Sequence, residues 1–141
     1  MNNENYSESL KQVFANADKL AEIFKSSYMG SEHLVFAMLN LPECAAYKIL
    51  STQGITAEEW EDYFARTIDT MSNIKGFTPR TQLMIQKATE LSNHVTRTDH
   101  LLAAIMSFDD CIAMRTLRCI GANLYELAMG IELSINEEVE E

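Results

Sequence analysis

The chain of 141 residues is 47% hydrophobic, which is enough for one domain with a core and too little for two large domains. It carries 11 Lys and Arg against 21 Asp and Glu, and the resulting net charge of −10 argues against nucleic acid as a partner. The sequence has neither an apolar run long enough to span a bilayer nor the pattern of a signal peptide. We therefore expect a cytoplasmic protein without a membrane partner.

Apolar residues recur at helical spacing along the chain, and only two prolines and five glycines interrupt them, so we expect an all-α fold. A first helix is predicted to begin near Ser7 or Ser9. Its apolar stripe consists of Leu10, Val13, Phe14, Ala17, Leu20, Ala21 and Phe24. Ser31 is expected to cap a second helix, and Pro42 to open a third that ends at Gly54.

A fourth helix is predicted after Thr56, which forms a capping box with Glu59. Its apolar residues are Trp60, Phe64, Ile68 and Met71. Residues 72–76 are expected to form a hinge loop. A fifth helix then starts with Thr78 as the cap and Pro79 as the first helical residue.

Three further helices are predicted in the last third of the chain. Thr98 is expected to cap the sixth helix, and the seventh runs from about Asp110 to a stop at Gly121. Asn123 and Glu126 form another capping box, which starts the eighth.

The second four helices repeat the first four. Identical residues lie 67 positions apart in the pairs His33 and His100, Leu34 and Leu101, Cys44 and Cys111, Leu50 and Leu117, and Gly54 and Gly121. Tyr6 and Phe77, the aromatic residues before the first helix of each repeat, are 71 apart, so repeat one holds four extra residues. Agreement at several positions in the same order indicates an internal duplication.

The duplication predicts the domain organisation. We expect a single domain over residues 1–141, with repeat one at about 6–72, repeat two at about 77–132 and an acidic tail at 133–141. Each repeat is too small for an independent core, so the two four-helix repeats are expected to pack about a pseudo-twofold axis as one unit of about eight helices.

Three short segments carry a resemblance to a known family. Residues 28–34 read YMGSEHL, residues 97–102 read RTDHLL, and residues 77–80 read FTPR. Together they resemble the duplicated signature of the Clp N-terminal domain, over about residues 6–131. The resemblance implies an all-helical domain that binds substrates and adaptors for a Clp-type AAA+ unfoldase. Its direct partners would be adaptor and client proteins, and the Clp ATPase ring and the Clp peptidase would be indirect partners.

No enzymatic activity is expected of this chain. It lacks the GxxxxGK[ST] phosphate loop of an ATPase, so we predict a recognition domain without a cofactor or catalytic residues. An alternative is a free-standing regulator of the same fold, which would bind adaptors or clients without an ATPase motor. A second alternative is a metal-dependent hydrolase that uses His33 and His100. No metal-ligand spacing supports it, and we expect buried imidazoles that bond across a helix start instead.

The resemblance also implies candidate binding residues. In the branch of the family that reads arginine-phosphorylated proteins, one acid in each repeat receives the guanidinium group of phosphoarginine, and those positions are Glu32 and Asp99 here. A carboxylate can bind a guanidinium through two parallel hydrogen bonds, and backbone N–H groups at a helix start suit a phosphate. Ser31 and Thr98 begin those helices, and Thr78 stands in the FTPR segment. The structural alternative for Glu32 is a first-turn acid worth about 0.3 to 1 kcal/mol to the helix.

The second of these two sites departs from the family pattern. Asp99 is one methylene shorter than the usual Glu, and Arg97 replaces the usual small Gly. Arg97 could block the site, pair with Asp99 or help to hold a phosphate. Tyr6 and Phe77 are further candidates, because in the family their edge contacts peptides. The alternative for both aromatic residues is a hydrophobic staple onto the following helix.

The remaining cysteines, methionines and histidine are expected to be structural. Cys44 and Cys111 lie at matching starts of the third helix of each repeat, Cys119 is expected in the core, and none forms a CxxC pair. His94 is predicted to face solvent in a loop. Core packing is the default for methionines at apolar helical positions, namely Met38, Met71 and Met84.

Overall fold

The computed structural model describes residues 5–26, 28–67 and 76–141, with the side chains of 64–67 left out. The helices in this part of the chain are α1 Glu8–Ile23, α2 Ser31–Leu39, α3 Ala45–Ser51, α4 Ala57–Thr67, α5 Pro79–Leu91, α6 Thr98–Met106, α7 Ile112–Ile120 and α8 Leu124–Glu137. Two strands of two residues each, β1 Tyr28–Met29 and β2 Gly76–Phe77, complete the elements. The predicted all-α class is confirmed.

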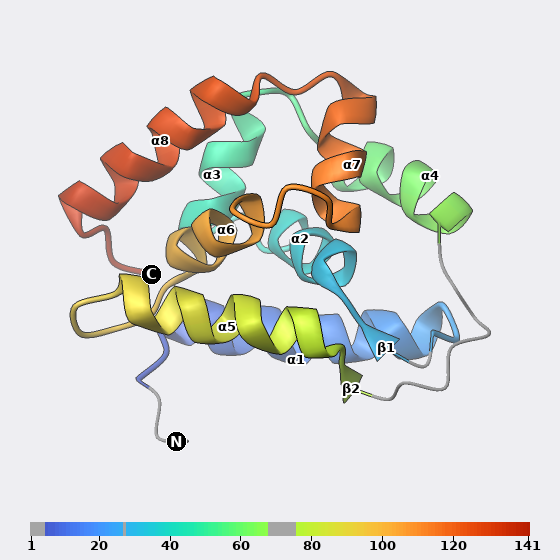
Figure 1. Ribbon diagram of the computed structural model, residues 1–141, viewed down its shortest axis with the longest axis horizontal. Coiled ribbons are helices and arrows are strands. Elements are labelled where there is room, and N and C mark those ends of the chain that lie inside the picture. Colours follow the sequence, from blue (N-terminus) through green and yellow to red (C-terminus); the bar gives the residue numbers. More distant parts are fainter. Residues whose placement is uncertain (1–4, 27, 68–75) are drawn as a thin grey trace.

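The helices of the two repeats are arranged with approximate twofold symmetry. In Figure 1, α1 and α5 run along one edge in opposite directions, and α2 and α6 lie in the centre. The outer helices of each repeat pack against those of the other repeat: α3 packs on α8, and α4 packs on α7. Each repeat therefore covers the core of the other, as expected for units too small to bury a core alone.

The starts of α2 and α6 differ from the prediction in one respect. Ser31 and Thr98 are the first helical residues, and Gly30 and Arg97 occupy the N-cap positions. A histidine three residues after each cap takes over the capping role. The backbone N–H of Gly30 donates to Nδ1 of His33, and that of Arg97 donates to Nδ1 of His100, each at 3.0 Å. The expected imidazole bonds across the helix starts are thus present.

The two hydroxyls, which are not needed as caps, join the repeats. Oγ of Ser31 accepts from the backbone N–H of Ala113 at 3.1 Å, and Oγ1 of Thr98 accepts from that of Ala46 at 3.0 Å. The two hydrogen bonds are related by the repeat. Each connects the start of the second helix of one repeat to the start of the third helix of the other. Both are buried, and buried amides require such a partner.

The short strands are also exchanged between repeats. Met29 pairs with Phe77 in a parallel ladder, and the equivalent pair in the other half is a single parallel bridge between Tyr6 and Thr96. Segments of one or two residues carry no periodic pattern, so helical spacing alone could not predict them.

Several predicted helix boundaries are corrected by the caps. α3 begins at Ala45 rather than at Pro42, because Cys44 is the cap and its Sγ accepts from the backbone N–H of Tyr47. Gly54 has the left-handed conformation expected of it, with φ of 72°, but it lies beyond the end of α3.

At the end of the chain, α8 continues to Glu137, so residues 133–137 belong to this helix rather than to a tail. Ile68, Met71 and the hinge residues 72–75 fall outside the described residues.

The core contains most of the predicted side chains. Trp60 is fully buried and donates its indole N–H to the carbonyl oxygen of Glu32 at 3.1 Å. Met38 and Met84 are buried, whereas Cys119 is exposed. The prediction for Cys119 was wrong because it lies two residues beyond the buried Leu117, about 200° around α7. None of the helices among the described residues combines the length and apolar character needed to cross a membrane.

Candidate functional site

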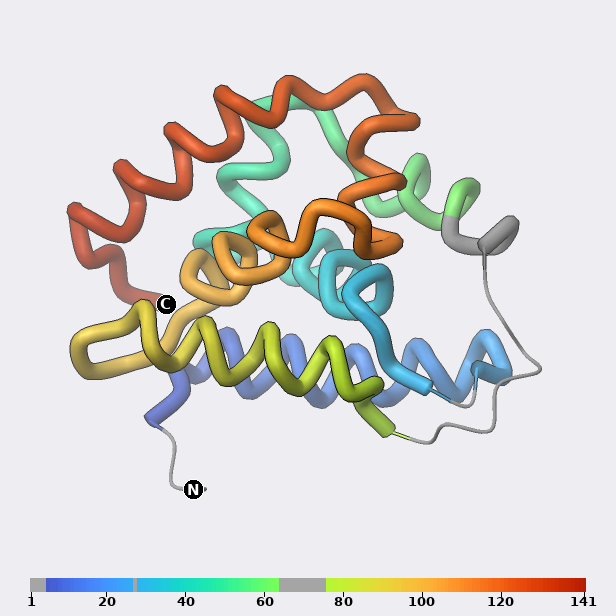
Figure 2. The backbone as a smooth tube through the Cα atoms, in the orientation of Figure 1, coloured from blue at the N-terminus to red at the C-terminus, as the bar shows by residue number. Residues whose placement is uncertain are grey.

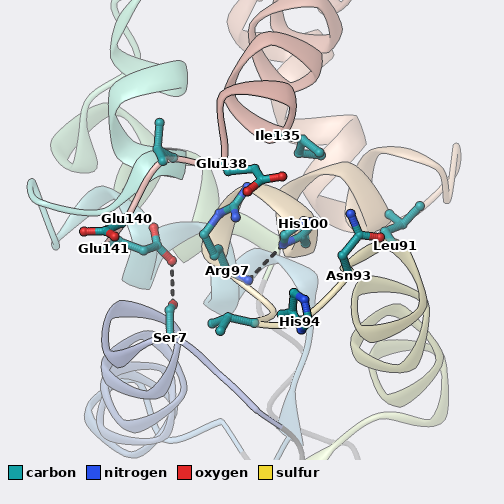
Figure 3. A pocket seen from close by; sticks show the side chains of 12 residues that line it. Ser7, Leu91, Asn93, His94, Arg97, His100, Ile135, Glu138, Glu140 and Glu141 are labelled. Carbon is teal, nitrogen blue, oxygen red and sulfur yellow. Dashed lines mark hydrogen bonds between the residues drawn. The ribbon is translucent and has the colours of Figure 1, made fainter.

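The chain places equivalent polar groups around a buried acid in each repeat, and the polar site in repeat two is filled. Its occupant is the side-chain carboxylate of Glu141, the last residue of the sequence (Figure 3). Oε2 accepts from the hydroxyl of Ser7 and the backbone N–H of Thr98, each at 2.7 Å. Oε1 accepts from the hydroxyl of Thr98 at 2.7 Å and the backbone N–H of Ala45 at 2.8 Å. Four donors that converge on two oxygens form an anion site.

Beside this anion site, a buried acid holds a guanidinium group. Nε and Nη2 of Arg97 donate to Oδ1 and Oδ2 of Asp99, both at 3.2 Å. The hydroxyl of Ser134 donates to Oδ2 at 2.6 Å, and the backbone N–H of His100 donates to Oδ1 at 2.8 Å. Of the three possibilities for Arg97, the geometry selects the pair with Asp99, whose oxygens are fully engaged.

The repeat-one copy places Glu32 at the position of Asp99. The Glu32 side chain is only 2% exposed, and the hydroxyl of Tyr28 donates to its Oε2 at 2.9 Å. Among the described residues, the one basic side chain within ion-pair distance of this carboxylate is His33, at 3.8 Å. No guanidinium of the chain reaches Glu32 in this part of the molecule.

A pocket of about 300 Å³ opens onto Glu32. Its polar lining comes from both repeats and includes two arginines at its edge. The polar lining residues are Tyr28, Ser31, Glu32, Thr78, Arg80, Thr81, Asp110 and Arg115. Arg80 forms an ion pair with Asp110 at 2.9 Å, so one of the two arginines is already partnered.

The donors of the filled site have direct equivalents around this pocket. Thr78 corresponds to Ser7 at the offset of 71 residues, and Ser31 to Thr98 at 67. Ile112, the first residue of α7, corresponds to Ala45. Ser31 and Ile112 are each the first residue of a nine-residue helix, where a backbone N–H has no partner within the helix. The pocket therefore presents groups equivalent to those that hold a carboxylate in repeat two, although the Thr78 hydroxyl also lies 2.8 Å from that of Thr81 and shares a hydrogen bond with it.

Two positions in each repeat, 30 and 32 and their equivalents 97 and 99, explain why the acid faces a pocket in one copy and is covered by an arginine in the other. A Cβ atom on Gly30 would lie 2.6 Å from Oε1 of Glu32, which is closer than atoms can approach. Repeat two tolerates Arg97 at this position together with Asp99, which is one methylene shorter. The combination of Gly and Glu leaves the acid facing a pocket, whereas the combination of Arg and Asp closes on itself.

The electrostatic environment differs between the two acids. Burial raises the pKa of Glu32, and the hydrogen bonds from its own backbone and from Tyr28 only partly oppose this effect. Burial lowers the pKa of His33 to about 4, so this imidazole is neutral at pH 7 and adds no positive charge beside Glu32. Burial also lowers the pKa of His100, which lies next to Arg97 and Asp99. A cation brought to Glu32 would therefore be stabilised by a carboxylate that lacks a charged partner.

The structure brings together six of the predicted site residues and leaves the two aromatic residues aside. Glu32, Ser31 and Thr78 line the repeat-one pocket, and Asp99, Thr98 and Arg97 form the repeat-two site. Tyr6 and Phe77 instead pack edge-on against Phe14, with ring centroids 5.3 and 5.8 Å from it. For Tyr6 this is a contact with the helix that follows it, as the packing alternative proposed, whereas the ring contact of Phe77 is with α1 of the other repeat.

Four contributors were not predicted from the sequence. Ser7 was available from the repeat, since it is the equivalent of Thr78 at the offset of 71. The backbone N–H groups of Ala45 and Ile112 have no signal in the sequence, because any residue can supply them. Glu141 could not be found by pattern, because its role depends on where the chain turns after α8.

The histidines do not form a metal site in the described part of the molecule. His33 and His100 each use Nδ1 to cap a helix, and no group of three or more potential metal ligands occurs there. His94 is exposed in the loop after α5, as expected. Burial raises the pKa of the Cys44 thiol, which makes it a poor nucleophile.

Comparison with known proteins gives a consistent family. The model of the Clp repeat N-terminal domain family matches residues 5–91. The chain is 27% identical to a ClpA homologue, an ATP-binding subunit of the Clp protease of Trieres chinensis, over 98% of its own length and 16% of the relative. It is also 27% identical to ClpC of Staphylococcus saprophyticus, over 83% of its length and 15% of the relative. The chain thus spans about a sixth of the length of these relatives.

Solved structures show the same fold over nearly the whole chain. The N-terminal domain of ClpD from Arabidopsis thaliana superposes with a TM-score of 0.78 at 18% identity and covers 96% of this chain and 97% of that one. The N-domain of ClpV, solved in complex with a VipB peptide, superposes with a TM-score of 0.71 at 18% identity and covers 91% and 88%. With two helical repeats, matching folds and a family model that covers more than half of its residues, the chain belongs to the Clp repeat N-terminal domain family.

Proposed function

We propose that this domain recognises adaptor and client proteins for a Clp-type unfoldase, and that its repeat-one pocket binds phosphoarginine on a client. The observation that carries the proposal is the buried Glu32, which faces the pocket without a charged cationic partner among the described residues and lies beside groups equivalent to those that hold an anion in repeat two. Such a pocket suits a ligand with a guanidinium group and an anion close together.

The guanidinium half of the ligand is supported by the internal comparison. At the equivalent position of repeat two, Asp99 receives Nε and Nη2 of Arg97 in a two-pronged arrangement. Glu32 presents the same type of group, and its Tyr28 hydrogen bond holds Oε2 in place. A planar guanidinium matches two carboxylate oxygens better than an ammonium group does, so arginine is favoured over lysine.

The anion half is supported by the donors opposite Glu32. The hydroxyl of Ser31 already accepts from Ala113, which leaves its own O–H to donate, as Thr98 does toward Glu141. The backbone N–H groups of Ser31 and Ile112 and the hydroxyl of Thr78 complete the equivalent set. Arg115 in the pocket lining adds positive charge in a chain whose net charge is −10, while the charge of Arg80 is balanced by its ion pair with Asp110. A phosphoryl group uses more of these donors than a carboxylate does.

Recognition without catalysis fits the relatives. The curated relatives are ATP-binding subunits of Clp proteases, and the ClpV N-domain binds a VipB peptide. The N-domain is a binding module, so the work on a client would be done by a motor outside these residues. A free-standing regulator is the other candidate role, since such a protein would occupy the same clients without delivering them. A degradation assay with added Clp ATPase and peptidase distinguishes the roles, because a separate regulator inhibits turnover of a marked client.

The binding proposal can be tested by NMR titration of the isotope-labelled chain with free phosphoarginine and with plain arginine. We expect saturable shifts of the Ser31 and Ile112 amides with phosphoarginine, and binding about 10- to 100-fold weaker with arginine, since each charge-assisted hydrogen bond is worth about 1.5 to 3 kcal/mol. Glu32→Gln should abolish both responses.

Glu58→Gln is the matched control, because Glu58 is also the second residue of a helix but is exposed. Binding that survives Glu32→Gln, or shifts that appear only away from the pocket, would contradict the proposed site. Adaptor binding would then have to be sought on another surface.

A further inference from the structure

We infer that the repeat-two site is occupied by the chain's own side chains, and that the domain therefore binds one external ligand rather than two. Arg97 supplies the guanidinium and Glu141 supplies the anion, so the two halves of a phosphoarginine-like ligand are both present within the chain. For the identity of the external ligand, this inference rests on the proposed function. The internal occupancy itself can be tested without any ligand.

The Glu141 carboxylate accepts more hydrogen bonds from the protein than an acid on the surface usually does. Its two oxygens accept four hydrogen bonds of 2.7 to 2.8 Å from Ser7, Ala45 and Thr98, which belong to both repeats. The hydroxyls of Ser7 and Thr98 also accept from backbone N–H groups, of Leu10 and Ala46, so each of them is fully used. An external anion would have to displace this carboxylate to reach the same donors.

The backbone after α8 is shaped to deliver this residue. Glu138 has a left-handed conformation with φ of 51°, which is uncommon for a residue with a side chain. This turn ends the helix and sends the last residues back toward the start of α6, where Figure 2 shows the C-terminus. The same residues, 138–141, line a cavity together with Ser7, Arg97 and His100 (Figure 3).

The guanidinium half is equally well held. The Arg97 side chain is 11% exposed and Asp99 is completely buried, so the pair lies largely out of water. Ser134 on α8 donates to the same carboxylate, which links the guanidinium pair to the helix that positions Glu141. Removal of Glu141 alone is therefore expected to open the anion part of the site and to leave Asp99 paired.

The first arm of the test compares amide spectra of the ligand-free chain and of Glu141→Gln. Loss of the charge should move the Thr98 and Ala45 amides and leave those of Ser31 and Ile112 in place. Glu140→Gln is the matched control, because it removes the same charge from the neighbouring exposed residue. Unchanged Thr98 and Ala45 amides in Glu141→Gln would overturn the inference, whatever repeat one binds.

The second arm titrates inorganic phosphate into the wild-type chain, Glu141→Ala and Glu140→Ala. A site occupied by its own tethered group about nine-tenths of the time binds an external competitor about tenfold more weakly. We expect the phosphate affinity reported by the Thr98 and Ala45 amides to be at least about tenfold higher in Glu141→Ala than in the other two proteins. Equal affinity in all three would overturn the inference. Repeat-one amides provide a separate readout, so failure of the proposed function is recognised independently.

Discussion

The two repeats share a scaffold and differ in what fills their equivalent sites. Both place a buried acid at the second residue of a helix, with a histidine beside it that caps the same helix. In repeat one the acid is Glu32 and its pocket is open, whereas in repeat two the acid is Asp99 and Arg97 covers it. The difference shows that a few substitutions can cover the buried acid of one copy with an arginine without changing the fold.

The cost of an open site is visible in the electrostatics. Asp99 has a guanidinium partner, whereas Glu32 is nearly as buried and, in the part of the chain that the structure describes, has a neutral imidazole and a phenol beside it but no guanidinium. A buried carboxylate without a cation destabilises the folded state. Repeat one therefore keeps an unfavourable buried acid, to which the proposed function assigns an external cation, whereas the acid of repeat two is paired within the chain. Each prediction below alters one side of this comparison.

The largest expected effect concerns the histidine of repeat one. Folding lowers the pKa of His33 from 6.5 to about 4, so the unfolded chain binds more protons in that interval. The contribution of the neutral His33 imidazole to the free energy of unfolding is fully present above pH 6.5. It is lost as the pH falls toward 4, and the loss amounts to about 3 kcal/mol. His33→Asn should be less stable at pH 7 and should lose this part of the pH dependence. Urea unfolding at several pH values measures the free energy of unfolding of both proteins. If this free energy depends on pH between 6.5 and 4 as steeply in His33→Asn as in the wild type, the pH dependence does not come from His33.

The second prediction converts repeat one into a copy of repeat two. Gly30→Arg combined with Glu32→Asp should form an internal pair and weaken phosphoarginine binding about 100-fold, the loss of about 2.7 kcal/mol of charge-assisted bonding. Glu32→Asp alone, which leaves the pocket uncovered, is the control. Calorimetric titration measures both. If the double variant binds as tightly as the control, an arginine at position 30 does not close the site.

The third prediction tests the symmetry of the hydroxyls that join the repeats. Ser31→Ala leaves the buried N–H of Ala113 without its acceptor and should lower the free energy of unfolding by about 1 to 3 kcal/mol. Thr98→Ala should cost at least as much, because it also removes a donor to Glu141. Ser31→Thr and Thr98→Ser keep the hydroxyl and should be nearly neutral. Denaturant unfolding of the four variants is the measurement, and equal stability of Ser31→Ala and Ser31→Thr would contradict the prediction.

The smallest effect is a gain in stability. The folded pKa of Glu32 is raised, so ionisation of this acid costs the folded state more as the pH rises above the unfolded value, near 4.5. Each unit of the rise corresponds to about 1.4 kcal/mol. Glu32→Gln is therefore expected to be at least as stable as the wild type at pH 7, and the difference should vanish below about pH 4. Thermal unfolding of both proteins at the two pH values tests this expectation. If Glu32→Gln is clearly less stable than the wild type at pH 7, the role of Glu32 is structural.

Much of the fold could be predicted because repeated local signals agreed. Pairs such as Cys44 and Cys111 fixed the duplication, and caps such as Thr78 and Asn123 lie where they were expected. The error at the starts of α2 and α6 arose because a residue there serves a distant partner. Ser31 has the chemistry of a cap, but its hydroxyl accepts from α7 of the other repeat, and Gly30 with His33 completes the local cap.

The candidate site was predictable only in part. The position of Glu32 follows from a short signature, but its burial and its pocket depend on helices from the other repeat. The pairing of Arg97 with Asp99 was one of several arrangements that the sequence allowed. The docking of Glu141 depends on a left-handed turn at Glu138, which is not a residue type that favours this conformation. Contacts between distant segments carry no periodic pattern, so they had to be observed.

The exchanged hydrogen bonds between repeats have a consequence for how such a domain arises. The Ser31 bond to Ala113 and the Thr98 bond to Ala46 are the same contact made twice, as in an isologous homodimer. The strand pairs, at Met29 with Phe77 and at Tyr6 with Thr96, obey the same rule. A single ancestral unit could have met all of these requirements by pairing with its own copy. Within one chain the two acids can differ, as Glu32 and Asp99 do, whereas a symmetric dimer of identical chains carries the same acid and the same neighbour in both copies.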